Sequence, residues 1–146
     1  MQRLVNDMKL TNRMENWISA LGVHIASSSK KGFPVVTVAE QVSVAGEKIN
    51  IVLSHLQVEQ IRRNIEENPV VALAPGHLGS IRAPYQLKGS AALNGYTLTV
   101  TVQEIYCTKP GAEAGIRLDT LGYDKMEQFD ESRWTDHVPD SPAARA

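Results

Sequence analysis

The sequence predicts a mainly β protein with peripheral helices, in which six antiparallel strands close into a small barrel. Residues 85–93 alternate between an apolar and a polar face, as strand residues do when one side of a sheet is buried. Asn94-Gly95 follows directly and is a strong signal for a two-residue hairpin into a strand at 96–107. With four further strand-like segments, the count is six strands of a length that closes most easily as a barrel.

Length and composition limit the classes of protein to which the chain can belong. The 146 residues suit a single domain over 1–146, with the barrel core at 11–118 and a weakly structured C-terminal extension at 119–146. The formal net charge of -1 argues against a nucleic-acid partner, which usually meets a basic excess. No apolar run approaches the ~20 residues of a membrane span, and the single Cys107 cannot form an internal disulfide. We therefore expect a soluble cytoplasmic protein with no membrane partner.

The first third of the chain predicts a helix followed by a hairpin. The helix has Thr11 as its N-cap and Gly22 as its stop. A short strand at 23–27 and a turn then lead to a long strand at 33–44. Both faces of that strand carry apolar residues, which indicates a barrel interior on one side and a cover on the other. The helix has an apolar stripe that consists of Met14, Trp17, Ile18 and Leu21.

A strand at 48–53 leads into the most regular helix of the sequence. Ser54 and Gln57 have the spacing of a capping box, so the helix is predicted to begin at Ser54. Asn68-Pro69 ends it, and a short apolar strand follows at 70–74. Its apolar stripe is formed by Val58, Ile61 and Ile65.

A loop at 75–84 precedes the strand at 85–93 and contains His77 and Arg82. Gly89 interrupts that strand, and an interior glycine marks a bulge, a bend of the barrel, or a place where another backbone or a ligand comes close. Beyond Asp119, a loose helix at 122–133 and a mobile tail at 138–146 are expected.

The order helix, hairpin, strand, helix, strand, hairpin resembles the FMN-binding split barrel of the pyridoxamine 5'-phosphate oxidase-like families. Three runs strengthen the resemblance, at 64–73, 85–92 and 104–117, and the match covers roughly 16–118. It implies a homodimer with flavin mononucleotide (FMN) in each of two clefts at the interface. It also implies an FMN-dependent oxidoreductase that acts on a small-molecule substrate or electron donor.

The resemblance further implies which residues hold the cofactor. The family binds the phosphate at the start of the helix at 54–63, where backbone N–H groups converge. The family's usual basic residue and its neighbour fall here on Gln60 and Ile61, a departure from the pattern, while Glu59 adds a negative charge. Arg62 and Arg63 stand next in line for the phosphate. The ring is expected along two strands and beside the polar face of a third, at Thr37, Val38, Ile51, Val52, Ser54 and Lys88.

Other interpretations of the same residues stay open. The ring-contact positions also suit an ordinary barrel wall. Lys88 also suits a charged rim of the barrel, and His55 suits the solvent-exposed first turn of the helix. His77 and Arg82 either border a substrate opening or face solvent, and core packing is favoured for Cys107. A split barrel without redox activity, serving as a ligand-binding or interaction module, is the second hypothesis, because Gln60 and Ile61 replace the expected phosphate ligands. A relative that uses a deazaflavin or haem is the third.

Overall fold

A computed structural model describes residues 10–76, 83–109, 111–122 and 125–126. The predicted helix at 122–133 falls largely outside these ranges, and the predicted tail at 138–146 does so entirely. Along the described chain the elements are α1 (Asn12–Leu21), β1 (Val23–Ser28), β2 (Pro34–Ala39), β3 (Val42–Ala45), β4 (Lys48–Val52), α2 (His55–Glu67), β5 (Val70–Pro75), β6 (Tyr85–Asn94), β7 (Thr97–Cys107) and the short 3-10 helix η1 (Asp119–Leu121).

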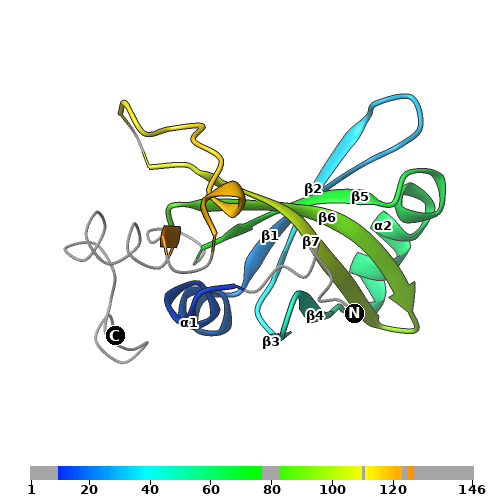
Figure 1. The fold of residues 1–146 in the computed structure, drawn as a ribbon. Coiled ribbons are helices and arrows are strands. Elements are labelled where there is room, and N and C mark those ends of the chain that lie inside the picture. The colour runs from blue at the N-terminus through cyan, green and yellow to red at the C-terminus, as the bar shows by residue number, and fades with distance from the viewer. Residues whose placement is uncertain (1–9, 77–82, 110, 123–124, 127–146) are drawn as a thin grey trace, which may run out of the picture.

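All seven strands belong to one antiparallel sheet that curls into a barrel (Figure 1). The order across the sheet is β2-β1-β5-β6-β7-β4-β3. Strands β6 and β7 form the longest hairpin, and Asn94 pairs with Thr97 beside its turn, as the Asn94-Gly95 signal predicts. The mainly β, antiparallel barrel predicted from the sequence is confirmed.

The strand count differs from the prediction because the segment at 33–44 forms two strands. The strand is interrupted at Glu40 and Gln41, which separate β2 from β3. These two strands lie at opposite edges of the sheet, so the break carries the chain from the first edge to the last. One straight strand cannot pair at both edges of a curled sheet. The second face of β2 is not fully covered in the structure, because Val36 has 63% of its surface exposed.

Gly89 allows the sheet to bend between β6 and β7. The pairing register shifts between Lys88 and Gly89, which marks an irregularity of the β-bulge kind. A Cβ atom at position 89 would lie 2.1 Å from the main-chain oxygen of Thr101. Only glycine permits this approach, so the interior glycine marks both an irregular register and a close backbone contact.

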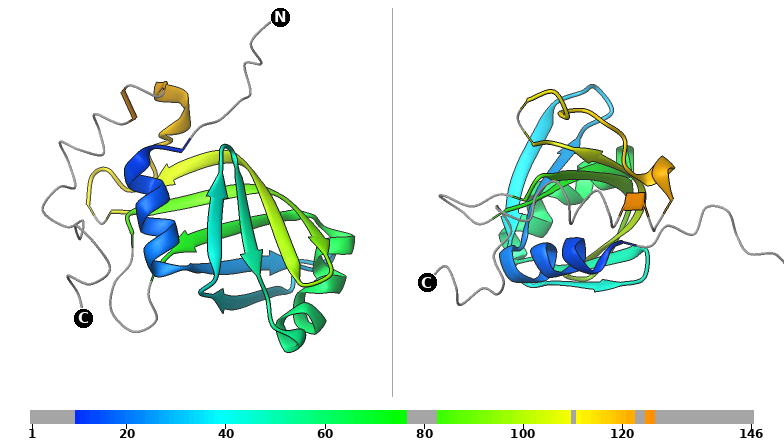
Figure 2. Two further views of the ribbon diagram at one scale, coloured as in Figure 1. Left: turned by 90° about the horizontal axis from the view of Figure 1, so that it is seen from below. Right: turned by 60° about the vertical axis from the view of Figure 1, so that its left-hand side comes forward.

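The two helices cover the ends of the barrel (Figure 2). Helix α1 packs against β3 and β5, and helix α2 packs against β1, β6 and β2. The side chains of Met14, Ile18 and Ile61 are fully buried beneath them. The helices have 10 and 13 residues, and no helix in the described ranges is long and apolar enough to cross a membrane.

The segment after β7 returns along the C-terminal part of that strand, beyond the residues of β7 that pair with β4. The Cys107 N–H donates to the carbonyl of Ile116, and the Leu118 N–H donates to the carbonyl of Ile105, both at 2.8 Å. Asp119 continues the contact, because its Oδ1 accepts from the Ile105 N–H at 2.8 Å. The first residue of the predicted extension is therefore bound to the barrel.

Candidate functional site

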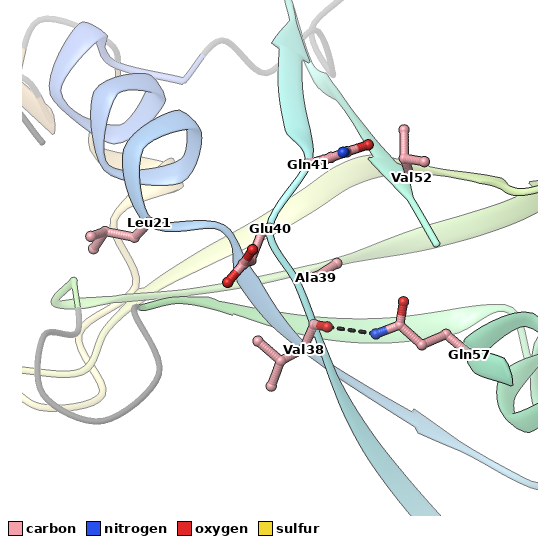
Figure 3. A pocket seen from close by; sticks show the side chains of 7 residues that line it. All are labelled: Leu21, Val38, Ala39, Glu40, Gln41, Val52 and Gln57. Atoms are coloured by element: carbon pink, nitrogen blue, oxygen red, sulfur yellow. Dashed lines mark hydrogen bonds between the residues drawn. The ribbon is translucent and has the colours of Figure 1, made fainter. Parts of the chain in front are cut away.

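A cavity of about 340 Å³ opens where β2 breaks from β3, beside the end of β4 and the start of α2 (Figure 3). Its size lies at the lower end of the ~300–1,000 Å³ that is usual for small-molecule sites. The last residue of α1 also reaches it, so four separate elements contribute to its wall. The lining residues are Leu21, Val38, Ala39, Glu40, Gln41, Val52 and Gln57.

Gln57 connects the start of α2 to strand β2. The Ser54 Oγ accepts from the Gln57 backbone N–H at 3.2 Å, and the Gln57 Oε1 accepts from the Ser54 backbone N–H at 2.9 Å. This reciprocal pair is the predicted capping box. The Gln57 Nε2 then donates to the Thr37 Oγ1 at 3.0 Å. It also donates to the main-chain carbonyl of Val38 (Figure 3). Both amide hydrogens of Gln57 are thus used within the protein, which fixes its orientation at the cavity wall.

The cavity wall combines apolar side chains with hydrogen-bond acceptors. Leu21, Val38, Ala39 and Val52 supply the apolar part. Glu40 contributes a carboxylate and Gln41 an amide, and both of these residues are exposed. No lysine, arginine or histidine of the described residues lines it. The wall therefore suits an apolar or aromatic body with a polar edge.

The structure gathers four of the six residues predicted to contact the ring. Val38 and Val52 line the cavity, and Thr37 and Ser54 bind the Gln57 side chain at its wall. Ile51 is fully buried in the core, and its main chain pairs with Val42 and Leu98. The chain brings these residues together because the end of β4 leads directly into the N-cap of α2.

The residues predicted to bind the phosphate lie further along α2 and do not line the cavity. Arg62 pairs with Glu59 at 3.7 Å and borders a second cavity next to Gly95 in the β6–β7 turn. Arg63 pairs with Glu67 at 3.2 Å. Consecutive helix residues point about 100° apart, so the two arginines occupy different flanks of the helix. Gln60 is exposed on the same helix.

Lys88 lies on the outer face of the barrel, in a charged cluster. Its Nζ is 4.9 Å from the centre of the Tyr106 ring, and the Arg117 guanidinium is 5.9 Å from the same centre. The Tyr106 hydroxyl donates to Glu104 at 2.9 Å, and this bond raises the pKa of the phenol. Arg117 is bound by Asp119, whose carboxylate raises the pKa of the guanidinium. Lys88 thus stabilises the outer face of β6 and β7, and it does not line the cavity at β2.

The remaining candidates do not gather at the cavity. His55 is exposed in the first turn of α2, and its ring centre lies 6.3 Å from that of Tyr96. Cys107 is buried, and burial raises the pKa of its thiol, so its position is that of a core residue. His77 and Arg82 lie outside the described residues. In the described ranges no three His, Cys, Asp or Glu side chains come together as a metal site.

Five of the seven residues that line the cavity were not predicted as site residues, and three of these five, Glu40, Gln41 and Gln57, are polar. Gln57 has a signal in the sequence, because its spacing from Ser54 predicts a capping box, but that signal does not predict its bonds to β2. Glu40 and Gln41 form the break between β2 and β3, which the sequence presents as part of one strand. Their role at the cavity follows from a bend that depends on both edges of the sheet.

The comparisons with known proteins identify the fold. A scan against protein-family models and a search of curated proteins both find no match. Among solved structures, HupZ from Group A Streptococcus matches with a TM-score of 0.57 and 19% identity, over 73% of this chain and 99% of that chain. A candidate pyridoxamine 5'-phosphate oxidase from Lactobacillus delbrueckii matches with a TM-score of 0.56 and 15% identity, over 73% and 100%.

A third match is an FMN-binding protein from Syntrophomonas wolfei, with a TM-score of 0.50 and 6% identity over 66% of this chain and 85% of that chain. The structural neighbours are pyridoxamine 5'-phosphate oxidase-like split-barrel proteins. At these identities the likeness establishes the fold alone. The split barrel predicted from the sequence is therefore confirmed.

Proposed function

We propose that this split barrel binds a flavin, with FMN as its cofactor, and serves as an oxidoreductase for a small-molecule substrate or electron donor. The observation that carries the proposal is the cavity at the β2–β3 break. It brings together Val38 and Val52, two residues predicted to contact the ring, and places the bound amide of Gln57 beside them. The fold shared with an FMN-binding protein supports the same assignment.

The residues at the cavity fit the ring of a flavin better than its phosphate. Val38 and Val52 offer apolar contact for a planar ring, and the amide of Gln41 offers a polar partner for its edge. Residues 55 and 56, whose N–H groups have no acceptor within the helix, do not line the cavity, so these groups are not part of its wall. A bound flavin supplies the redox chemistry, while the chain orients the ring and sets access to it.

We also propose that the protein is a homodimer with a cofactor cleft at the interface. One part of the outer face of the sheet, around the middle of β7, supports this proposal, because small and polar side chains there allow close approach of a second copy. The pairings Ser90–Thr101 and Thr99–Asn50 place these side chains side by side across three strands. The half-buried outward residues of this region and of the neighbouring strand β5 are Asn50, Ala72, Ala74, Ser90, Thr99 and Thr101.

A second candidate function is a split barrel that binds a ligand without redox chemistry. The charges on the structure favour it, because both arginines predicted to bind phosphate form ion pairs with glutamates on α2. Glu40 adds a negative charge at the cavity itself. The absorption spectrum of the purified protein distinguishes the candidates: a flavin absorbs in the blue and near ultraviolet, haem gives a Soret band, and an empty barrel gives neither.

Val52→Trp tests the flavin proposal directly. Val52 lines the cavity with 46% of its surface exposed, so an indole there fills the space that the ring requires. We expect the wild-type protein to quench FMN fluorescence on titration and the variant to lose at least tenfold in affinity. Mass spectrometry of the small molecule released on denaturation of freshly isolated protein identifies the native occupant.

Val70→Trp provides the matched control. Val70 has a similar exposed fraction, 52%, but lies at the start of β5 and does not line the cavity. It should leave FMN affinity unchanged. A wild-type protein that is isolated without a flavin and produces no quenching with added FMN would exclude the first candidate and leave the ligand-binding module.

A further inference from the structure

The negative side of the cavity lies at the break between β2 and β3. Glu40 and Gln41 are adjacent there, and both line the cavity. Gln41 is held at the wall through its main chain, because its carbonyl accepts from the Val52 N–H at 2.9 Å. Glu40 also lies close to Gly22, because a Cβ added at Gly22 would lie 3.0 Å from the Glu40 Cα. The Glu40 carboxylate therefore extends from a segment that is hydrogen-bonded to β4 and packs closely against Gly22.

The Glu40 carboxylate is the charged group among the described residues that line the cavity, and the Gln41 amide there can both donate and accept hydrogen bonds. The Glu40 carboxylate has no donor hydrogen, and the carbonyl of Val38 also lies at the wall. The two donor hydrogens of Gln57 are used by Thr37 and Val38. An anionic group placed beside Glu40 would be repelled, because no lysine, arginine or histidine of the described residues lines the cavity to offset that charge.

The two arginines of α2 form ion pairs with glutamates of the same helix. Arg63 pairs with Glu67, whose Oε1 also accepts the Lys30 backbone N–H at 2.9 Å, so this arginine is drawn toward the β1–β2 turn. Arg62 pairs with Glu59 on the flank that faces the β6–β7 turn. Neither arginine belongs to the wall of the cavity at the β2–β3 break.

From this distribution of charge we propose that the cavity selects its ligand by the ring alone, and that a phosphate on the ligand adds nothing to affinity. The inference rests on the proposed flavin function and specifies the ligand class: a planar heterocycle that is unphosphorylated, or whose phosphate stays in solvent on the side of Glu40. Riboflavin should then bind at least as tightly as FMN. A site that recognises phosphate gains one or more charge-assisted hydrogen bonds and should favour FMN by roughly tenfold or more.

The test is a parallel titration of the full chain with riboflavin and with FMN, monitored by flavin fluorescence. We expect the two dissociation constants to agree within about threefold in the wild type, or riboflavin to bind more tightly. Glu40→Lys should shift the ratio toward FMN by roughly tenfold, because it replaces a repulsive charge with an attractive one. Glu47→Lys makes the same charge change at the opposite end of β4 and should leave the ratio unchanged.

Each other outcome overturns a defined part of the argument. If wild-type protein binds FMN tenfold more tightly than riboflavin, the inference on selectivity is wrong and the proposed flavin function stands. If neither compound binds, both fail together. If Glu40→Lys binds riboflavin normally but leaves the ratio unchanged, Glu40 does not determine the selectivity of the site and the inference fails. Unaltered far-ultraviolet circular dichroism of both lysine variants establishes that they are folded.

Discussion

At the scale of single residues, Gln57 has the most varied set of bonds in the site. Its side chain closes the capping box with Ser54 and donates to Thr37 and Val38 on β2. The spacing of Ser54 and Gln57 was sufficient to predict the start of the helix, because a capping box is a local interaction. The contact with Thr37 spans 20 residues of sequence and depends on how the barrel folds, so local spacing could not predict it.

Gln57→Ala should destabilise the protein and weaken ligand binding together. The variant loses one half of the capping box and both bonds to β2, and we expect the free energy of unfolding to fall by about 1–3 kcal/mol. Urea denaturation followed by circular dichroism measures this change, and FMN titration measures the affinity.

Gln60→Ala is the control for that substitution. It removes the same side chain one turn further along α2, where the residue is exposed, and should change stability by no more than about 0.5 kcal/mol. If both substitutions cost the same, the bonds of Gln57 to β2 contribute no measurable stability.

At the scale of elements, the strands and helices that depend on local patterns were predicted well. The β6–β7 hairpin follows from alternation and Asn94-Gly95, and both helices follow from their caps and apolar stripes. The segment at 33–44 was predicted as one strand and forms two. Alternation continues through Glu40 and Gln41 in the sequence, and only the curvature of the whole sheet requires the chain to change edges there.

The last turn of α2 is joined to the β1–β2 hairpin through Glu67, and this contact depends on pH. The Lys30 backbone N–H and then Arg63 lower the pKa of the Glu67 carboxyl below its ordinary 4.5. Its folded pKa is thus below its unfolded value. The contribution to stability is therefore present above about pH 4.5 and is lost as the pH falls through the folded pKa.

Glu67→Gln should reveal this dependence. We expect the wild type to be more stable than the variant at pH 7, and the difference to shrink toward zero as the pH falls below about 4. Chemical denaturation of both proteins across this range measures it. Glu66→Gln, an exposed neighbour on the same helix, should stay within about 0.5 kcal/mol of wild type throughout. A difference between wild type and Glu67→Gln that grows on acidification would contradict the assignment.

At the scale of the whole molecule, the barrel assembles a cavity from segments that are distant in sequence. Residues of α1, β2, β4 and α2 meet there. The resemblance to the split-barrel family predicted the strands that contribute Val38 and Val52. It did not predict that Arg62 and Arg63 would be engaged by Glu59 and Glu67, because these pairs form along the helix surface of this particular chain.

The proposed homodimer can be tested on the outer face of the sheet. Thr101→Arg places a long charged side chain among the small residues of β7, opposite Ser90. We expect light scattering coupled to size exclusion to give twice the 16.0 kDa chain mass for the wild type and a single chain mass for the variant. Flavin affinity should fall with the loss of the dimer, because the proposed cleft lies at the interface.

Thr120→Arg is the matched control for the dimer. It introduces the same side chain at an exposed position in η1 and should leave the mass unchanged. A wild-type protein that elutes as a single chain and still binds flavin would contradict the proposal that the cofactor cleft lies at a dimer interface.

The crossing at Glu40 and Gln41 also affects how the protein withstands aggregation. The outermost strands of an open sheet expose unpaired N–H and carbonyl groups, on which strands of other molecules can grow into fibres. In this chain the two edge strands, β2 and β3, follow one another in the sequence. At the bend between them, the Gln57 side chain donates a hydrogen bond to the Val38 carbonyl, and the Val52 N–H donates one to the Gln41 carbonyl. After a protease cut at this bend, β2 would be joined to the sheet through β1 alone and β3 through β4 alone, so we expect the intact chain to resist self-association through these edges better than the cut chain.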